Sequence, residues 1–140
     1  MYLKKDFTPD KIYKLKENQI FVFGSNPQGR HGKGGAKYAK DRFGAIQGQA
    51  FGLQGQSYAI ITKELRSWKP AITLEQIKHQ IKVLFEYAQK NQDKEFLVTK
   101  IGCSLAYFSV AEIRSLFKDI MCEKGLPVNI MLPKEFILDI

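Results

Sequence analysis

Short, continuous apolar runs alternate along this chain with longer stretches in which apolar residues recur every three or four positions. The continuous runs are typical of buried strands and the longer stretches of amphipathic helices. The predicted strands occupy residues 19–23, 58–61, 95–99 and 128–132. The predicted helices occupy residues 34–43, 74–90 and 110–124. This alternation predicts an α/β fold, a three-layer α/β/α arrangement with a central, mainly parallel sheet and helices on both faces.

Three sequence signals predict where helices begin. Thr73–Gln76 and Ser109–Glu112 both match a capping box, in which a hydroxyl and an amide or carboxylate satisfy each other's backbone N–H groups. Near the N-terminus, Thr8-Pro9-Asp10 resembles an N-cap with proline in the first turn, and it predicts one helical turn over residues 11–15.

The stretch that carries the most chemistry is the loop between the first strand and the first helix. Five glycines lie within twelve residues, at positions 24, 29, 32, 34 and 35, and Arg30, His31 and Lys33 lie among them. Glycines let a phosphate approach the backbone, and the N-terminus of the helix at Gly34-Gly35 offers unpaired N–H groups and partial positive charge. The spacing matches neither the Walker A motif nor the Rossmann fingerprint. The loop therefore predicts an anion site of the phosphate type.

Other polar and glycine-rich segments follow the second and third strands. Because the carboxyl ends of parallel strands meet at one edge of a sheet, Asn26, Gly34, Lys63 and Gly102 are expected around one cleft. The segment 45–57 is uncharged, with three glycines and four glutamines. We expect it to form an ordered loop that approaches the first loop. The alternative is that it folds across the sheet edge and fills the cleft.

Composition and charge narrow the class of protein. The 140 residues suffice for a single domain, 1–140, with no internal repeat. The net charge is +8, and residues 1–44 alone carry ten Lys/Arg against four Asp/Glu. Such a surplus steers polyanions or a phosphorylated small molecule toward the first loop. Two cysteines without a signal pattern favour reduced thiols in the cytoplasm. No apolar run approaches the roughly 20 residues that span a bilayer, so no membrane association is predicted.

Four stretches carry a resemblance to a known family: FVFGSN, GRHGKGGAKYA, GLQGQSYAI and TKIGC. They resemble macro domains, the ADP-ribose-binding fold, and in particular a group of small, partly phage-borne macro-domain-like proteins. The resemblance runs from Gln19 to Phe136. It implies binding of ADP-ribose or a related nucleotide, because macro domains bind such ligands and some hydrolyse ADP-ribosyl bonds or phosphates.

The resemblance also implies positions for the ligand. Asn26 falls where the family places an asparagine near the distal ribose, Gly34 and Gly35 fall beside the diphosphate, and 101–103 falls on the opposing loop. The sequence departs from the family pattern in two places. After the opposing loop at 101–103, Ser104, Tyr107 and Phe108 occupy positions where a more glycine-rich turn is expected. The aspartate that macro domains use toward adenine is not evident near Phe23.

Whether the chain is an enzyme stays open at this point. His31 is the candidate acid–base because histidine titrates near neutrality, although ligand contact is the role that we expect of it. Asn26 is the second catalytic candidate, for an ADP-ribosyl or phosphate-ester hydrolase. Cys103 could be a nucleophile, but a small buried cysteine is the commoner explanation. Lys63 could hold a phosphate or act as a base, and the alternative is an ordinary exposed lysine. No His/Cys pattern predicts a metal or other cofactor.

The predicted partner is thus a small phosphorylated nucleotide, sequestered or hydrolysed. The alternative is a basic nucleic-acid-binding module without catalysis. One observation argues against it: aromatic and basic residues are not interleaved on one strand or helix, as base-stacking surfaces require. The predicted ligand-binding residues are Gly24, Ser25, Asn26, Arg30, Lys33, Gly34, Gly35, Lys63, Ile101, Gly102 and Cys103.

Overall fold

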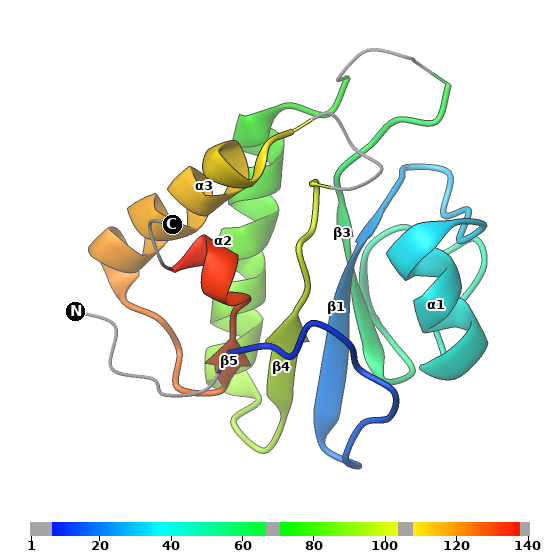
Figure 1. Ribbon diagram of the computed structural model, residues 1–140, viewed down its shortest axis with the longest axis horizontal. Coiled ribbons are helices and arrows are strands. Elements are labelled where there is room, and N and C mark those ends of the chain that lie inside the picture. Colours follow the sequence, from blue (N-terminus) through cyan, green and yellow to red (C-terminus); the bar gives the residue numbers. More distant parts are fainter. Residues whose placement is uncertain (1–6, 67–70, 104–107, 138–140) are drawn as a thin grey trace.

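A computed structural model describes residues 7–66, 71–103 and 108–137 of the chain. The described residues form a five-stranded sheet, three α-helices and one short 3-10 helix (Figure 1). In chain order the elements are β1 (Gln19–Ser25), α1 (Gly34–Arg42), β2 (Gly52–Gln54), β3 (Ser57–Ile61), α2 (Leu74–Lys90), β4 (Glu95–Val98), α3 (Val110–Lys124), β5 (Ile130–Met131) and the 3-10 helix η1 (Lys134–Phe136).

The sheet has the strand order β2-β3-β1-β4-β5 and is mixed. β1 lies at its centre and pairs in parallel with both β3 and β4, and β4 pairs in parallel with β5. The edge strand β2 is antiparallel to β3. The predicted α/β class is therefore confirmed, and all four predicted strands are present, although β5 is shorter than expected. β2 was not predicted, because it lies within the uncharged segment 45–57, which we expected to be a loop.

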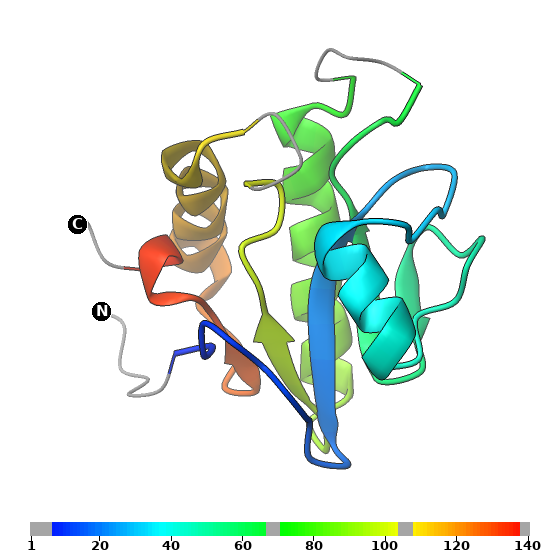
Figure 2. The same cartoon turned by 45° about the vertical axis from the view of Figure 1, so that its right-hand side comes forward.

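The two faces of the sheet carry separate apolar clusters, and β1 supplies both. Its residues Ile20 and Val22 belong to the cluster under α2 and α3, whereas Phe21 and Phe23 belong to the cluster under α1. This follows from the period of two along a strand, which sends successive side chains to opposite faces. Figure 2 shows α1 on one side of β1 and α2 on the other.

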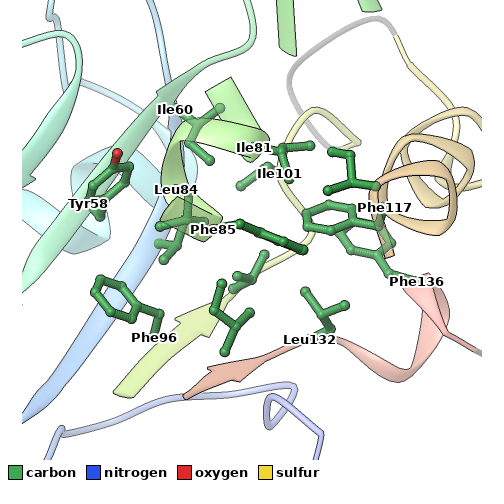
Figure 3. Packing of buried hydrophobic residues seen from close by; sticks show 14 of the residues in the cluster. Tyr58, Ile60, Ile81, Leu84, Phe85, Phe96, Ile101, Phe117, Leu132 and Phe136 are labelled. Atoms are coloured by element: carbon green, nitrogen blue, oxygen red, sulfur yellow. The ribbon is translucent and has the colours of Figure 1, made fainter. Parts of the chain in front are cut away.

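The larger cluster lies between the sheet and the helices α2 and α3 (Figure 3). Phe136, from η1, is fully buried in it and stacks on Phe117 of α3 with ring centroids 5.1 Å apart. The ring of Phe85, on α2, also packs on Phe117, with ring centroids 6.3 Å apart. The C-terminal segment is therefore part of the core, because η1 returns an aromatic side chain to α3.

Ion pairs join α2 and α3 along their outer faces. Lys78, Lys82 and Glu86 of α2 lie 3.5, 3.6 and 3.6 Å from partners on α3. These partners are Asp119, Glu123 and Lys124, respectively. A helical pattern in the sequence identifies the polar face of a helix but not the neighbouring helix beside it, so these pairs follow only from the packing of α2 against α3.

Both predicted capping boxes are confirmed. The Thr73 and Ser109 side chains accept from the N–H groups of Gln76 and Glu112, whose side chains accept in return from the two cap residues. These reciprocal bonds explain why α2 and α3 begin where the sequence predicts.

The helical turn predicted over residues 11–15 is wrong, because residues 7–16 contain no helix. The hydroxyl that was to cap the turn, Thr8 Oγ1, instead donates to the carbonyl oxygen of Met131 at 2.9 Å, and the Thr8 N–H donates to the carbonyl of Leu132. Ile12 is buried beneath α1. Pairing with the end of β5 and apolar burial therefore determine the path of this segment.

Candidate functional site

The loop that follows β1 is held in shape by Asn26. Its Oδ1 accepts from the N–H of Arg30 at 2.9 Å, and its Nδ2 donates to the carbonyl of Arg30 at 2.8 Å. Asn26 itself is 6% exposed, whereas the Arg30 side chain is exposed. Both polar atoms of the Asn26 amide therefore stabilise the turn, and these bonds explain an asparagine at this position without any contact to a ligand.

The first loop packs against the segment 45–57, as expected. Gly48 donates to the carbonyl of Gly29 at 2.7 Å, and a Cβ built on Gly29 would lie 2.5 Å from the carbonyl carbon of Gly48. Only glycine permits this approach, since Gly29 also has a φ of +65°. The segment supports the first loop from the β2 side.

His31 lies beneath the loop and is fully buried. Its Nε2 is 3.1 Å from both the carbonyl of Gln49 and Oε1 of Gln54, and its ring stands edge-on to Phe23 at 5.2 Å. Oε1 of Gln54 also accepts from the N–H of Ile46, so both neighbours of Nε2 are acceptors and Nε2 is the protonated nitrogen.

This placement favours a structural role for His31. A general acid or base must come within hydrogen-bond reach of a substrate atom, and a fully buried ring beneath a loop does not. The other ring nitrogen, Nδ1, is also buried and has no hydrogen-bond partner among the described residues.

At the carboxyl edge of the sheet, the exits of β1, β3 and β4 meet. A Cβ built on Gly24 would lie 2.9 Å from Oγ1 of Thr62 and 3.7 Å from the backbone nitrogen of Gly102. The N–H groups of Thr62 and Lys63 both donate to the carbonyl of Ser25, at 3.0 and 3.3 Å. The expectation that these exits share one edge is confirmed, and around Gly24 they are packed closely against one another.

The loop after β4 turns two predicted ligand residues toward the protein interior. Ile101 is 2% exposed and belongs to the core under α2 and α3, and Cys103 packs against the same cluster. Burial raises the pKa of the Cys103 thiol to about 11, an effect that Lys100 only partly offsets. The thiol is therefore protonated at neutral pH, which removes the nucleophilic thiolate.

The described surface contains a pocket of about 510 Å³ on the α1 face of the sheet, beside the carboxyl end of β4. This volume lies in the range of small-molecule sites, about 300–1,000 Å³. Its lining comes from the N-terminal segment, β1, α1, the exit of β4 and the residue before η1. The lining residues are Thr8, Pro9, Asp10, Lys11, Ile12, Tyr13, Phe21, Gly34, Gly35, Tyr38, Thr99, Lys100 and Pro133.

The first turn of α1 forms one polar wall of this pocket. The N-cap residue, Lys33, makes no side-chain cap, and the first turn contains no acidic residue. The N–H groups of an uncapped first turn point out of the helix and carry partial positive charge. Gly34 and Gly35 are exposed and line the pocket, so these groups lie at its wall.

The opposite wall is formed where β4 ends. Thr99 is fixed there by two bonds to the carbonyl of Val22, from its hydroxyl at 2.7 Å and from its N–H at 3.2 Å. Lys100 follows and is exposed. Phe21 and Tyr38, with ring centroids 5.9 Å apart, add aromatic surface between the two walls.

The N-terminal segment closes a third side of the pocket and is fastened at two points. Thr8 bonds to the backbone at Met131, and the carbonyl of Ile12 accepts from the Tyr38 hydroxyl at 2.5 Å. Residues 8–13 carried no functional signal in the sequence, which instead suggested a helical turn. Thr99-Lys100 could have been found, since they follow a predicted strand at the carboxyl edge.

Of the predicted site residues, the pocket brings together Gly34 and Gly35 with residues that were not predicted. Lys33 adjoins it in sequence, and its side chain, like that of Arg30, is exposed. Ser25 is 3% exposed, and its hydroxyl donates within the loop to the carbonyl of Asn26 at 3.4 Å. The remaining predicted residues lie in the loop after β1 or at the packed strand exits: Gly24, Asn26, His31, Lys63, Ile101, Gly102 and Cys103.

Comparison with known proteins adds no relative: no protein-family model and no curated protein matches the chain. Among the described residues, no group of three or more His, Cys, Asp or Glu is placed to hold a metal ion. In that same part of the chain, no helix combines the length and apolar character needed to cross a membrane.

Proposed function

We propose that this chain is a macro-domain-like protein with a three-layer α/β/α arrangement, and that it binds an ADP-ribose-like nucleotide or nucleotide-derived signal. One observation carries the proposal. The glycine pair at the start of α1 and the Thr99-Lys100 exit of β4 line the same pocket, on the α1 face of the sheet.

The phosphates of the ligand would lie at the first turn of α1. Gly34 and Gly35 let an anion approach the backbone, and a helix N-terminus attracts negative charge. Lys11, which lines the pocket as well, would contribute positive charge from the N-terminal wall. Lys100 would contribute from the β4 wall, where its Nζ also lies 3.5 Å from the Glu135 carboxylate. The base or a ribose would pack on Tyr38, whose ring is partly exposed in the pocket lining, whereas Phe21 is 5% exposed.

The geometry supports binding and sequestration better than hydrolysis. The acid–base candidate His31 is fully buried, Asn26 is engaged in bracing its own loop, and the thiol of Cys103 is kept protonated by burial. None of these three catalytic candidates lines the pocket. The two cysteines, Cys103 and Cys122, are free thiols, and the proposal includes a reducing compartment such as the cytoplasm.

A thermal-shift screen tests the proposal directly. The panel is ADP-ribose, its cyclic and phosphorylated variants, ADP, AMP and cyclic dinucleotides. A ligand present at 100 times its Kd stabilises the folded state by about 2.7 kcal/mol, which raises Tm by roughly 10 °C for a chain of this size. Calorimetric titration should then give saturable binding of one ligand per chain, and chromatography of the incubated ligand should show it unchanged. A panel in which no nucleotide raises Tm would contradict the proposal.

A further inference from the structure

Positive charge is concentrated on one side of the molecule. Between residues 8 and 43 there are eight Lys/Arg against three Asp/Glu, and all eight cationic side chains are exposed. We call these eight residues the basic surface: Lys11, Lys14, Lys16, Arg30, Lys33, Lys37, Lys40 and Arg42. They come from the N-terminal segment, the first loop and α1.

The charges of the basic surface are largely uncompensated, unlike those on the opposite side. With other described residues, the basic surface forms one ion pair, Lys37–Asp41 at 2.6 Å within α1. By contrast, α2 and α3 pair cations with anions between the two helices in three places. The described residues after position 70 carry nine Lys/Arg against eight Asp/Glu. Most of the net charge of the protein therefore lies around α1.

The basic surface adjoins the pocket. Lys11 lines it, and Lys33 immediately precedes the glycine pair that forms its wall. The Arg42 guanidinium lies 5.0 Å from the centre of the Tyr38 ring, another part of the lining. Lys40, however, follows Gly34 by six residues, about 9 Å farther along the helix axis. A single bound nucleotide would not use the cations at that end of α1.

We propose that the pocket, besides a free ADP-ribose-like nucleotide, accepts one nucleotide of a single-stranded nucleic acid whose neighbouring phosphates lie on the basic surface. This inference rests on the proposed function, because it uses the same nucleotide pocket. Exposed cations that extend beyond the pocket suit a ligand that carries one negative charge per residue. The partly exposed ring of Tyr38, in the pocket lining, provides the stacking contact that an unpaired base makes with proteins. A duplex base would first have to leave its stack, so the single strand is the favoured form.

The test uses fluorescence anisotropy with a labelled single-stranded DNA 12-mer and its RNA counterpart. The affected variant is Lys14→Gln/Lys40→Gln, because both lysines belong to the basic surface and neither lines the pocket. The matched control is Lys90→Gln/Lys94→Gln, which removes the same charge at the turn between α2 and β4, far from the carboxyl edge.

For the wild type, we expect log Kobs to fall linearly with log salt, with a slope of about −3 if four phosphates are contacted. Lys14→Gln/Lys40→Gln should make the slope less steep by about 1.4 and weaken binding in 0.1 M salt by roughly 25-fold. The same variant should bind ADP-ribose as the wild type does. The control should match the wild type for both ligands, and excess ADP-ribose should displace the strand from the pocket.

Three results would overturn the inference. The first is ADP-ribose binding without oligonucleotide binding, which would leave the pocket proposal intact. The second is oligonucleotide binding that survives both Gly35→Glu and excess ADP-ribose, because the basic surface would then act apart from the pocket. The third is binding of heparin or of anionic phospholipid vesicles as tight as that of the 12-mer, which would identify a general polyanion surface. Failure of the pocket proposal itself is recognised separately, by the absence of any mononucleotide binding.

Discussion

The hydroxyl of Tyr38, on α1, donates a hydrogen bond to the backbone carbonyl of Ile12 at 2.5 Å and so joins the pocket's helical wall to its N-terminal wall. The two residues are 26 positions apart in the sequence. Ile12 is also buried against the apolar cluster under α1. The N-terminal segment is therefore a built part of the candidate site, held by both apolar burial and this bond.

Tyr38→Phe should loosen the N-terminal segment without unfolding the protein. The ring packing is retained and one hydrogen bond is lost, so urea unfolding should show a loss of about 1 kcal/mol. Hydrogen exchange of the amides over residues 11–14 should become faster, and nucleotide affinity should fall. Tyr87→Phe is the control, because Tyr87 lies on α2 and does not line the pocket. Unchanged exchange over these residues in Tyr38→Phe would show that apolar burial alone holds the segment.

Gly35→Glu should abolish nucleotide binding while the protein stays folded. A Cβ at Gly35 would have only the Cβ of Phe23, 4.0 Å away, as a neighbour, so the backbone accepts a side chain there. The new carboxylate would enter the pocket at the helix N-terminus and compete with a phosphate in both space and charge. Circular dichroism should be unchanged and the thermal shift with ADP-ribose should disappear.

Gly32→Glu is the matched control for that variant. A Cβ at Gly32 has open space around it, and Gly32 lies on the same loop but does not line the pocket. It should retain nucleotide binding within a fewfold of wild type. Equal loss in both variants would point to a general charge effect, and full affinity in Gly35→Glu would move the site elsewhere.

His31→Ala should reduce stability more than it changes chemistry. Removing the buried ring leaves a cavity next to Phe23 and removes the donor to Gln49 and Gln54. The expected loss is about 2–4 kcal/mol of unfolding free energy, measured in urea. His79→Ala, at an exposed position of α2, should change it by no more than about 0.5 kcal/mol. Any hydrolytic turnover of ADP-ribose that collapses in a folded His31→Ala protein, while binding persists, would restore the acid–base role.

Cys103 should react slowly with iodoacetamide at neutral pH, and its alkylation rate should still be rising at pH 10. Burial raises the pKa of this thiol to about 11, so at pH 8 its thiolate fraction is on the order of 100-fold below that of an ordinary cysteine. Its rate should rise about tenfold per pH unit between pH 8 and 10, because the thiolate is the reactive form. Mass spectrometry of labelled peptides measures this, with the exposed Cys122 as internal reference. Labelling of Cys103 as fast as that of Cys122 at pH 7.5 would indicate an activated thiol.

The helices, most of the strands and their order along the chain could be predicted from the amino-acid pattern alone. These features depend on short-range patterns that a few neighbouring residues carry. In β1, alternate residues face opposite sides of the sheet, as the period of two along a strand requires. In the capping boxes at Thr73 and Ser109, the cap and its partner are only three positions apart. The shared carboxyl edge also followed, because parallel strands joined by helices place their exits together. The glycine pair at Gly34 could therefore be expected at a sheet edge.

Which of these residues form a pocket could not be predicted without the complete fold. The hydroxyl of Thr8 bonds to the carbonyl of Met131, 123 positions away, and this contact turns a predicted helical turn into a wall of the pocket. His31 looked like a ligand-facing side chain, but Gln54 of the unpredicted strand β2 accepts from its ring and accounts for its burial. Such contacts join residues that no local pattern relates, so their outcome depends on how complete segments pack. Local preference is a small energy per residue, and burial of apolar side chains with satisfied hydrogen bonds outweighs it.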